Sequence, residues 1–302
     1  MTKSIEDSIR SLVRGAGVEA SVELTKELEQ LGLGFREQMG QVHLSQPLEL
    51  LDANEILHWV SSKPDLEIHW SIDSTNSHLV GKKPKSVTIC LAEQQLAGRG
   101  RRGKSWVSPF GKNIYLSLGR EFRRQITDLG GLSLVVGTQV VKTLHACGLK
   151  DTGLKWPNDI LLKGGKLAGI LVELGAPADG GMFAVIGVGI NLSLQEADSQ
   201  QIDQPHTTVE QYGSVSRNEL TGKLCENLLQ AMTVFERDGF AAYHEEWNHY
   251  NLYRGRQVMI HRGEERIDGI DTGVDENGNL LLKTTEGVRV FNAGEVSLRA
   301  RD

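Results

Sequence analysis

The stretch EQQLAGRGRRGKSW, residues 93–106, carries the strongest signal in this chain of 302 residues. Its glycines at 98, 100 and 103 match the dinucleotide pattern G-x-G-x-x-G. However, SPFG at 108–111 follows where that pattern requires a helix to receive a pyrophosphate. Four cations remain within six residues: Arg99, Arg101, Arg102 and Lys104. Glycines let a backbone approach a ligand and keep a loop mobile, and cations neutralise phosphate or carboxylate. We interpret the stretch as a ligand-binding loop; a solvated basic loop is the alternative.

A second chemical signal combines KWPND at 155–159 with KLAGI at 166–170. Lys166 follows Asp159 by seven residues across a turn at Gly164-Gly165, so the two side chains could meet on paired strands. Such a pair could hold an acyl phosphate: the lysine would stabilise negative charge and the aspartate would orient a cation or an attacking amine. A surface ion pair is the alternative. The stretch GGKL at 164–167 is not a P-loop, because no Ser or Thr follows the lysine.

Two shorter motifs are ambiguous when taken alone. GVGIN, residues 187–191, ends a predicted strand with small residues and an amide. It could be a tight strand end, or a place where a flat ring approaches the backbone and Asn191 reads its edge. DSTN, residues 73–76, could be a plain helix cap or a polar cluster that faces a ligand.

The periodicity between these motifs predicts an α+β fold. We expect strands at 87–91, 114–118, 167–174 and 182–192, helices at 52–60, 128–147, 217–237 and 240–250, and a loop connector at 175–181. Strict alternation of strand and helix is missing, so a mixed sheet is favoured over a doubly wound one. This part, residues 48–252, is predicted to be the catalytic domain.

The two ends of the chain differ from the middle. Residues 1–47 suggest two helices and a ribbon at 35–44, an abbreviated winged-helix-like module. Residues 253–302 contain short strands with turn residues between them, which indicates a small barrel. Residues 1–50 hold five basic and eight acidic side chains, a net charge of −3 where a DNA-gripping helix would be positive.

Composition excludes several classes of protein. The net charge is −6, 39% of residues are hydrophobic, and no apolar run is long enough to span a membrane. Three scattered cysteines, Cys90, Cys147 and Cys225, form no CxxC pair, so we expect reduced thiols in a cytoplasmic protein and no membrane partner. The opening residues do not resemble a secretory signal.

In this order, the DSTN, GRGRRG, KWPND, KLAGI and GVGIN motifs resemble those of the biotin protein ligases, above all the bacterial enzymes that double as biotin operon repressors. The resemblance runs from about residue 48 to the end, and it includes a terminal SH3-like barrel with GEVSLR at 294–299. It implies an enzyme that makes biotinyl-5′-adenylate from biotin and ATP, with Mg²⁺, and then transfers biotin to a lysine of the biotin carboxyl carrier protein of acetyl-CoA carboxylase. A lipoate ligase of related architecture is disfavoured by the glycine-arginine loop and the barrel.

The resemblance also implies roles for individual residues. Four would act in catalysis: Lys166, Arg99, Arg101 and Asp159. The biotin-binding set would be Ser74, Thr75, Asn76, Gln95, Arg99, Gly100, Arg101 and Lys166. The nucleotide-binding set would be Lys104, Trp106, Asn158 and Asn191. No metal ligand is assigned, although Asp159 could reach a magnesium ion through phosphates.

Further partners follow from the same resemblance. Relatives of the repressor type bind operator DNA, and members of the family often form homodimers. The acidic N-terminal segment argues against DNA binding here, so repression is the alternative function. A regulator that senses biotin without transferring it is disfavoured, because Asp159 and Lys166 are both present.

Overall fold

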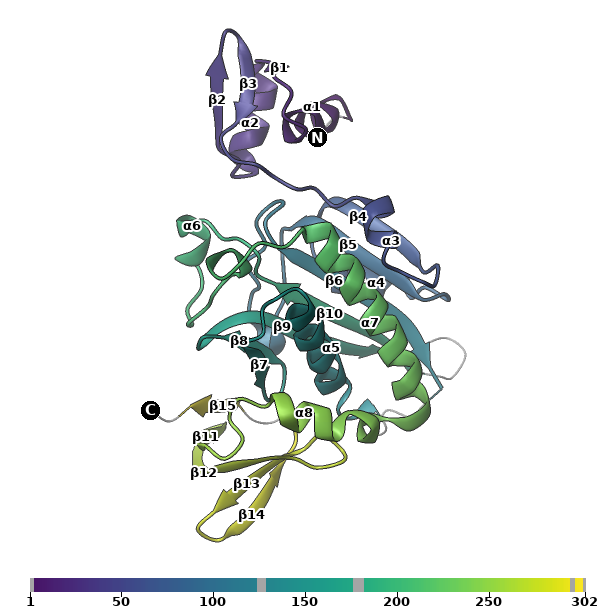
Figure 1. The fold of residues 1–302 in the computed structure, drawn as a ribbon, viewed down its shortest axis with the longest axis vertical. Helices are drawn as coiled ribbons and strands as arrows, with labels where there is room; N and C mark the ends of the chain where they lie inside the picture. Colours follow the sequence, from purple (N-terminus) through teal and green to yellow (C-terminus); the bar gives the residue numbers. More distant parts are fainter. Residues whose placement is uncertain (1–2, 124–128, 176–181, 294–296, 301–302) are drawn as a thin grey trace.

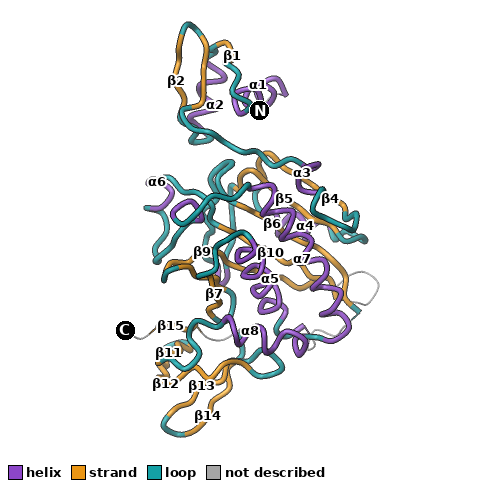
Figure 2. The backbone as a smooth tube through the Cα atoms, in the orientation of Figure 1, coloured by secondary structure: helices purple, strands orange, loops and turns teal. Residues whose placement is uncertain are grey.

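The computed structural model describes residues 3–123, 129–175, 182–293 and 297–300. Its strands form three sheets that follow one another along the chain (Figure 1). The N-terminal module lies at one end of the molecule, the largest sheet in the middle, and the C-terminal sheet at the other end. The backbone trace shows that long helices accompany the central sheet alone (Figure 2).

The N-terminal module packs two helices on a three-stranded sheet of order β1-β3-β2. Its elements are α1 (Lys3–Val13), β1 (Val18–Glu19), α2 (Val22–Gln30), β2 (Phe35–Gln38) and β3 (Gln41–Leu44). Ser21 caps α2 by accepting a hydrogen bond from the Leu24 amide. The β2–β3 hairpin turns at Met39 and Gly40, both at positive φ. The predicted helices and ribbon are therefore present.

Seven strands form the central sheet, in the order β4-β5-β6-β10-β9-β8-β7. They are β4 (Asp65–Ile72), β5 (Thr88–Gln95), β6 (Ile114–Phe122), β7 (Thr152–Lys155), β8 (Asp159–Leu162), β9 (Gly165–Gly175) and β10 (Met182–Ile190). Only β4 and β5 run parallel among the described pairs. The predicted mixed sheet is confirmed. The sequence analysis did not predict β4 and β7, and it indicated β8 only through the suggestion that Asp159 and Lys166 lie on paired strands.

Helices cover both faces of this sheet. On one face lie α5 (Leu132–Ala146) and α7 (Arg217–Asp238), packed on each other and on the largest hydrophobic cluster. On the other lies α4 (Thr75–Lys82), over a small cluster of Leu79, Cys90, Phe183 and Val185. Alternate residues of a strand point to opposite faces, so Ile89 and Leu91 join the first cluster while Cys90 joins the second.

The remaining helical elements are short. They are α3 (Ala53–Leu57), η1 (Arg101–Gly103), α6 (Glu196–Ser199), η3 (Val209–Gln211), η4 (Phe240–Tyr243) and α8 (His244–Tyr250). The helix predicted to reach residue 60 ends at Leu57, and the one predicted for 240–250 is split between η4 and α8. The helix predicted from residue 128 begins at Leu132. Three predicted parts lie outside the described residues: residue 128, residues 176–181 of the predicted connector and residues 294–296 of the GEVSLR motif.

The C-terminal sheet has five antiparallel strands in the order β14-β13-β12-β11-β15. These are β11 (Gln257–Arg262), β12 (Glu265–Val274), β13 (Leu280–Thr284), β14 (Gly287–Phe291) and β15 (Ser297–Ala300). Trp156 fixes it to the central domain by donating from Nε1 to the Gly278 carbonyl at 3.1 Å. Of the helices described, none is long and apolar enough to cross a bilayer.

Candidate functional site

The floor of a pocket is formed where the residues of β10 that face α4 become small. Along β10, Phe183 and Val185 pack under α4, and the next two residues on that face are Gly187 and Gly189. A methyl group at Gly187 would meet Asn76 Oδ1 at 2.3 Å, and one at Gly189 would meet the Trp106 ring at 2.5 Å. The two glycines thus make room for an amide and an indole ring.

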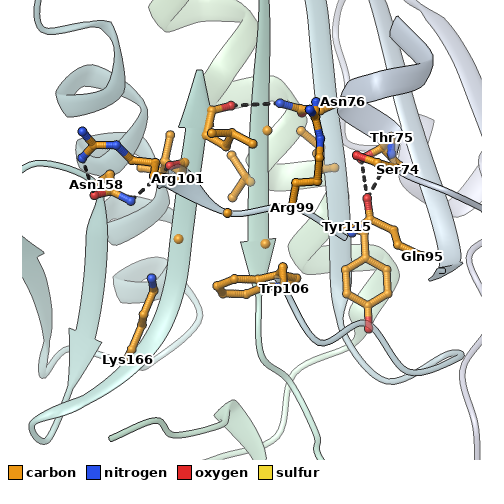
Figure 3. A pocket seen from close by; sticks show the side chains of 18 residues that line it. Ser74, Thr75, Asn76, Gln95, Arg99, Arg101, Trp106, Tyr115, Asn158 and Lys166 are labelled. Atoms are coloured by element: carbon orange, nitrogen blue, oxygen red, sulfur yellow. Dashed lines mark hydrogen bonds between the residues drawn. The ribbon is translucent and has the colours of Figure 1, made fainter. Parts of the chain in front are cut away.

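A hydrogen-bonded cluster fixes the polar end of the pocket (Figure 3). Thr75 donates from its amide and its hydroxyl to Gln95 Oε1, at 3.0 and 3.1 Å. Ser117 Oγ lies 2.8 Å from Thr75 Oγ1 and 2.6 Å from Asn76 Oδ1, with which it can form a hydrogen bond. Because Ser74, Thr75 and Asn76 are also buried, this end is rigid and suited to a ligand that both donates and accepts hydrogen bonds.

The cationic loop is folded as a narrow hairpin. Trp106 donates its backbone amide to the Gly98 carbonyl at 2.9 Å, and η1 forms the tip. Arg99 pairs with Glu173 at 2.6 Å, and the same carboxylate oxygen accepts from Asn76 Nδ2 at 2.9 Å. The loop is therefore attached to β9 through an acidic residue that the sequence analysis did not identify.

Arg101 anchors the loop to two further parts of the molecule. Its guanidinium donates to Asn158 Oδ1 at 2.9 Å and to the carbonyl of Ala293, near the C-terminal sheet. Burial is the main cause that lowers the pKa of Arg101, and the neighbouring Arg102 lowers it further. Asn158 in turn donates to the Ile170 carbonyl on β9 at 3.2 Å.

Lys166 and Asp159 form an ion pair of 2.7 Å, as their spacing around the predicted turn suggests. Both side chains are largely buried, at 15% and 17% exposure. Lys166 Nζ also lies 5.5 Å from the centroid of the Trp106 ring, at which distance a cation and an indole attract each other. Trp106 Nε1 is buried and finds no hydrogen-bond partner in the described part of the chain.

A second pocket adjoins the first and shares Lys166 and Trp106 with it. Its other lining residues include Lys104, Asn191, Asp203 and His206. The Asn191 amide is buried beside the Lys166 and Thr207 carbonyls. A third recess is lined by cations and one acid: Arg101, Arg102, Lys104, Lys155, Lys166, Arg299 and Asp159. Burial lowers the pKa of Lys155 there.

The structure brings the residues predicted from sequence together. All eight predicted biotin-binding residues line the first pocket, with Trp106 and Asn158; Lys104 and Asn191 line the second, and Asp159 the third. Tyr115, Ser117 and Glu173 were missed. The signal for two of them was a lone polar residue within an apolar strand, Ser117 in IYLSL and Glu173 in ILVEL.

Two family models match the chain. The Biotin/lipoate A/B protein ligase family matches residues 68–191, and the Biotin protein ligase C terminal domain matches residues 254–299. The first range contains every pocket motif described above, and the second corresponds to the C-terminal sheet.

Similar proteins agree with these models. The Bifunctional ligase/repressor BirA of Escherichia coli is 37% identical over 86% of this chain and 81% of its own length. The Biotin--[acetyl-CoA-carboxylase] ligase of Mycobacterium tuberculosis is 32% identical over 76% and 88%. The biotin protein ligase of Aquifex aeolicus, solved in complex with biotin and ATP, has a TM-score of 0.67 and 27% identity over 78% of this chain and 99% of that one. The chain therefore belongs to the biotin protein ligase family of enzymes.

Proposed function

We propose that the protein joins biotin to ATP as biotinyl-5′-adenylate and then transfers the biotinyl group to one lysine of a biotin carboxyl carrier protein. The observation that carries this is the pair of pockets that meet at Lys166 and Trp106. The first pocket has a rigid polar end suited to an uncharged head group, and the second adjoins the recess rich in cations. The ammonium group of Lys166 lines both pockets.

In the first step, a carboxylate oxygen of biotin attacks the α-phosphorus of ATP, and the bond to pyrophosphate breaks. Both reactants are anions, so they repel each other until cations neutralise them. Lys166 would contact the carboxylate and then the acyl-phosphate oxygen, while Arg99 and Arg101 approach from the loop. Ser74, Thr75, Asn76 and Gln95 would hold the head group.

In the second step, the lysine amine of the carrier attacks the acyl carbon, AMP leaves, and an amide forms. Asp159 would orient the incoming amine from its place beside Lys166. Trp106, Lys104, Asn158 and Asn191 would bind the nucleotide part. The folded loop would exclude water that could otherwise hydrolyse the mixed anhydride.

A magnesium ion fits this site only through the nucleotide. Mg²⁺ is usually bound by one or two carboxylates together with substrate phosphates. Asp159 is the one carboxylate that lines the cationic recess among the residues described, and it would hold the ion. The ion would supply charge neutralisation at the phosphates.

The test is a biotinylation assay with a carrier domain. The protein is incubated with ATP and either biotin or lipoic acid, and the carrier mass is measured. We expect one biotinyl group to be added, no lipoyl group, and no reaction when the acceptor lysine is replaced by arginine. Lipoylation would point to the other branch of the matched family, and adenylate binding without transfer would point to a sensor.

A further inference from the structure

A group of potential metal ligands lies beneath α4, outside the substrate pockets. His69 of β4, His78 of α4 and Cys90 of β5 each offer one ligand atom, and the three atoms lie within 4.8 Å of one another. Sheet register explains the arrangement: Glu67 pairs directly with Cys90, and His69, two residues along β4, points to the same face. None of the four residues lines either substrate pocket.

Glu67 completes this group. Its Oε2 lies 2.8 Å from His78 Nε2 and 3.5 Å from His69 Nε2, so one carboxylate already contacts both rings. The two rings are 4.8 Å apart between centroids. His69 Nε2 is buried and makes no hydrogen bond within the described residues, so a ligand nitrogen is left unused there.

We propose that His69, His78, Cys90 and Glu67 form a binding site for a divalent cation of the zinc type. Zinc takes four ligands in a tetrahedron, with nitrogen, sulfur and oxygen at about 2.0–2.3 Å. That geometry places ligand atoms about 3.3–3.8 Å apart, so the side chains must close by about 1 Å. Two imidazoles and a thiolate favour zinc and similar cations over magnesium or calcium, which prefer oxygen ligands.

Burial raises the pKa of the Cys90 thiol to about 12, so a bound dication must displace the thiol proton. A thiolate and a carboxylate together neutralise it, and the imidazoles bind as neutral rings. Lys82 pairs with Glu67 at 2.5 Å and would move away when the cation binds. Since the Lys82 side chain is half exposed, its release into solvent costs little.

Occupation of this site would connect the elements that hold the head-group end of the substrate pocket. His78 shares α4 with Thr75 and Asn76, and Cys90 shares β5 with Gln95. A cation that binds the folded protein alone stabilises it by mass action. The thermal midpoint should therefore rise with zinc and return to its starting value when a chelator is added.

Cobalt(II) is the spectroscopic probe for this proposal. Protein freed of metal by a chelator is titrated with Co²⁺, and we expect one equivalent to bind with a thiolate-to-cobalt charge-transfer band that Zn²⁺ abolishes. Cys90→Ser should remove the band. Cys225→Ser is the matched control, because Cys225 is also a fully buried free thiol but lies in α7, on the opposite face of the sheet.

Two histidine variants cover the case in which Cys90→Ser does not fold. His69→Gln and His78→Gln should each weaken Co²⁺ binding by about 100-fold. Mutation of residues that only orient a metal ligand already lowers metal affinity by up to about that factor, and these histidines would be ligands themselves. Circular dichroism checks that each variant is folded. No charge-transfer band with the wild-type protein, a band lost equally in Cys225→Ser, or unchanged Co²⁺ affinity in both folded histidine variants would each overturn the proposal.

Discussion

At Lys166 the carboxylate of one substrate and the phosphate of the other would meet the same ammonium group. Lys166→Ala should lower the rate of adenylate formation by about 100-fold or more, as the loss of one transition-state contact does. Biotin-dependent pyrophosphate release measures this step. Lys163→Ala is the control, because Lys163 lies at the turn of the same β8–β9 hairpin but pairs with the exposed Asp151. A rate near that of the wild type for Lys166→Ala would contradict the assigned role.

Gly187 tests the polar end of the pocket separately from the nucleotide side. A methyl group there would meet Asn76 Oδ1 at 2.3 Å and displace the amide from its partner Ser117. Gly187→Ala should therefore raise the KM for biotin by about tenfold, roughly the loss of one hydrogen bond to a buried group, and leave the KM for ATP unchanged. Gly175→Ala is the control: its methyl group would meet nothing within 4 Å, so the KM for biotin and the KM for ATP should both remain unchanged. If Gly187→Ala raised the KM for biotin and the KM for ATP equally, the polar end of the pocket would not be specific to biotin.

Some site residues could be predicted from sequence because their motifs are local. Asp159 and Lys166 are separated by one short turn, so their spacing alone places them together. Glu173 and Ser117 could not be assigned in this way. Each stands alone in an apolar strand, and only the order of strands in the sheet shows that they face Arg99 and Asn76.

The start of helix α7 is held by a buried ion pair. Arg217 and Glu93 are 3% and 2% exposed and bond to each other, and Glu93 also accepts from the Leu51 amide at 2.6 Å. Arg217→Ala would leave Glu93 buried without its cation, so we expect a loss of about 3–5 kcal/mol in the free energy of unfolding. Urea unfolding measures this loss: the midpoint should fall, while the slope of the unfolding free energy against urea concentration should stay unchanged. The exposed pair between Arg262 and Glu265 is the control, and Arg262→Ala should leave the urea midpoint nearly unchanged. Equal urea midpoints for Arg217→Ala and Arg262→Ala would show that burial of the ion pair does not determine how much stability its loss costs.

The long elements could be predicted and several short ones could not. The α7 pattern extends over six turns of apolar periodicity, and the structure extends it by one residue. Strands β7 and β8 have four residues each and lie on either side of a proline, so both are too short for their period to be recognised, and only the turn at Gly164-Gly165 pointed to β8. They exist because β8 pairs with β9 and β7 pairs with β8, which satisfies their backbone groups.

On the scale of the whole molecule, the N-terminal module contacts the domain that carries the cationic loop. The Arg10 guanidinium lies 5.2 Å from the Trp70 ring centroid, and Trp70 packs against Phe110, 4.7 Å between centroids. Phe110 lies four residues beyond Trp106 and belongs to the same hydrophobic cluster as the module's helices. The module is thus packed against the scaffold of the site, which gives its helices a structural role that needs no DNA.

Charge decides whether the module could also bind DNA, which bears on the repressor half of the name "Bifunctional ligase/repressor" that the E. coli relative carries. Helix α2 carries Glu23, Glu27 and Glu29 against one basic residue, Lys26, and residues 1–50 have a net charge of −3. Binding to duplex DNA depends on cations that replace condensed counterions. In a gel-shift assay with biotin operon DNA, biotin and ATP, we expect no complex tighter than about 10⁻⁵ M at physiological salt, within the nonspecific range. A repressor with a measured affinity for its own operator serves as the positive control. A salt-sensitive, adenylate-dependent complex at nanomolar protein would show that cations outside α2 grip the phosphates, and it would make this chain both ligase and repressor.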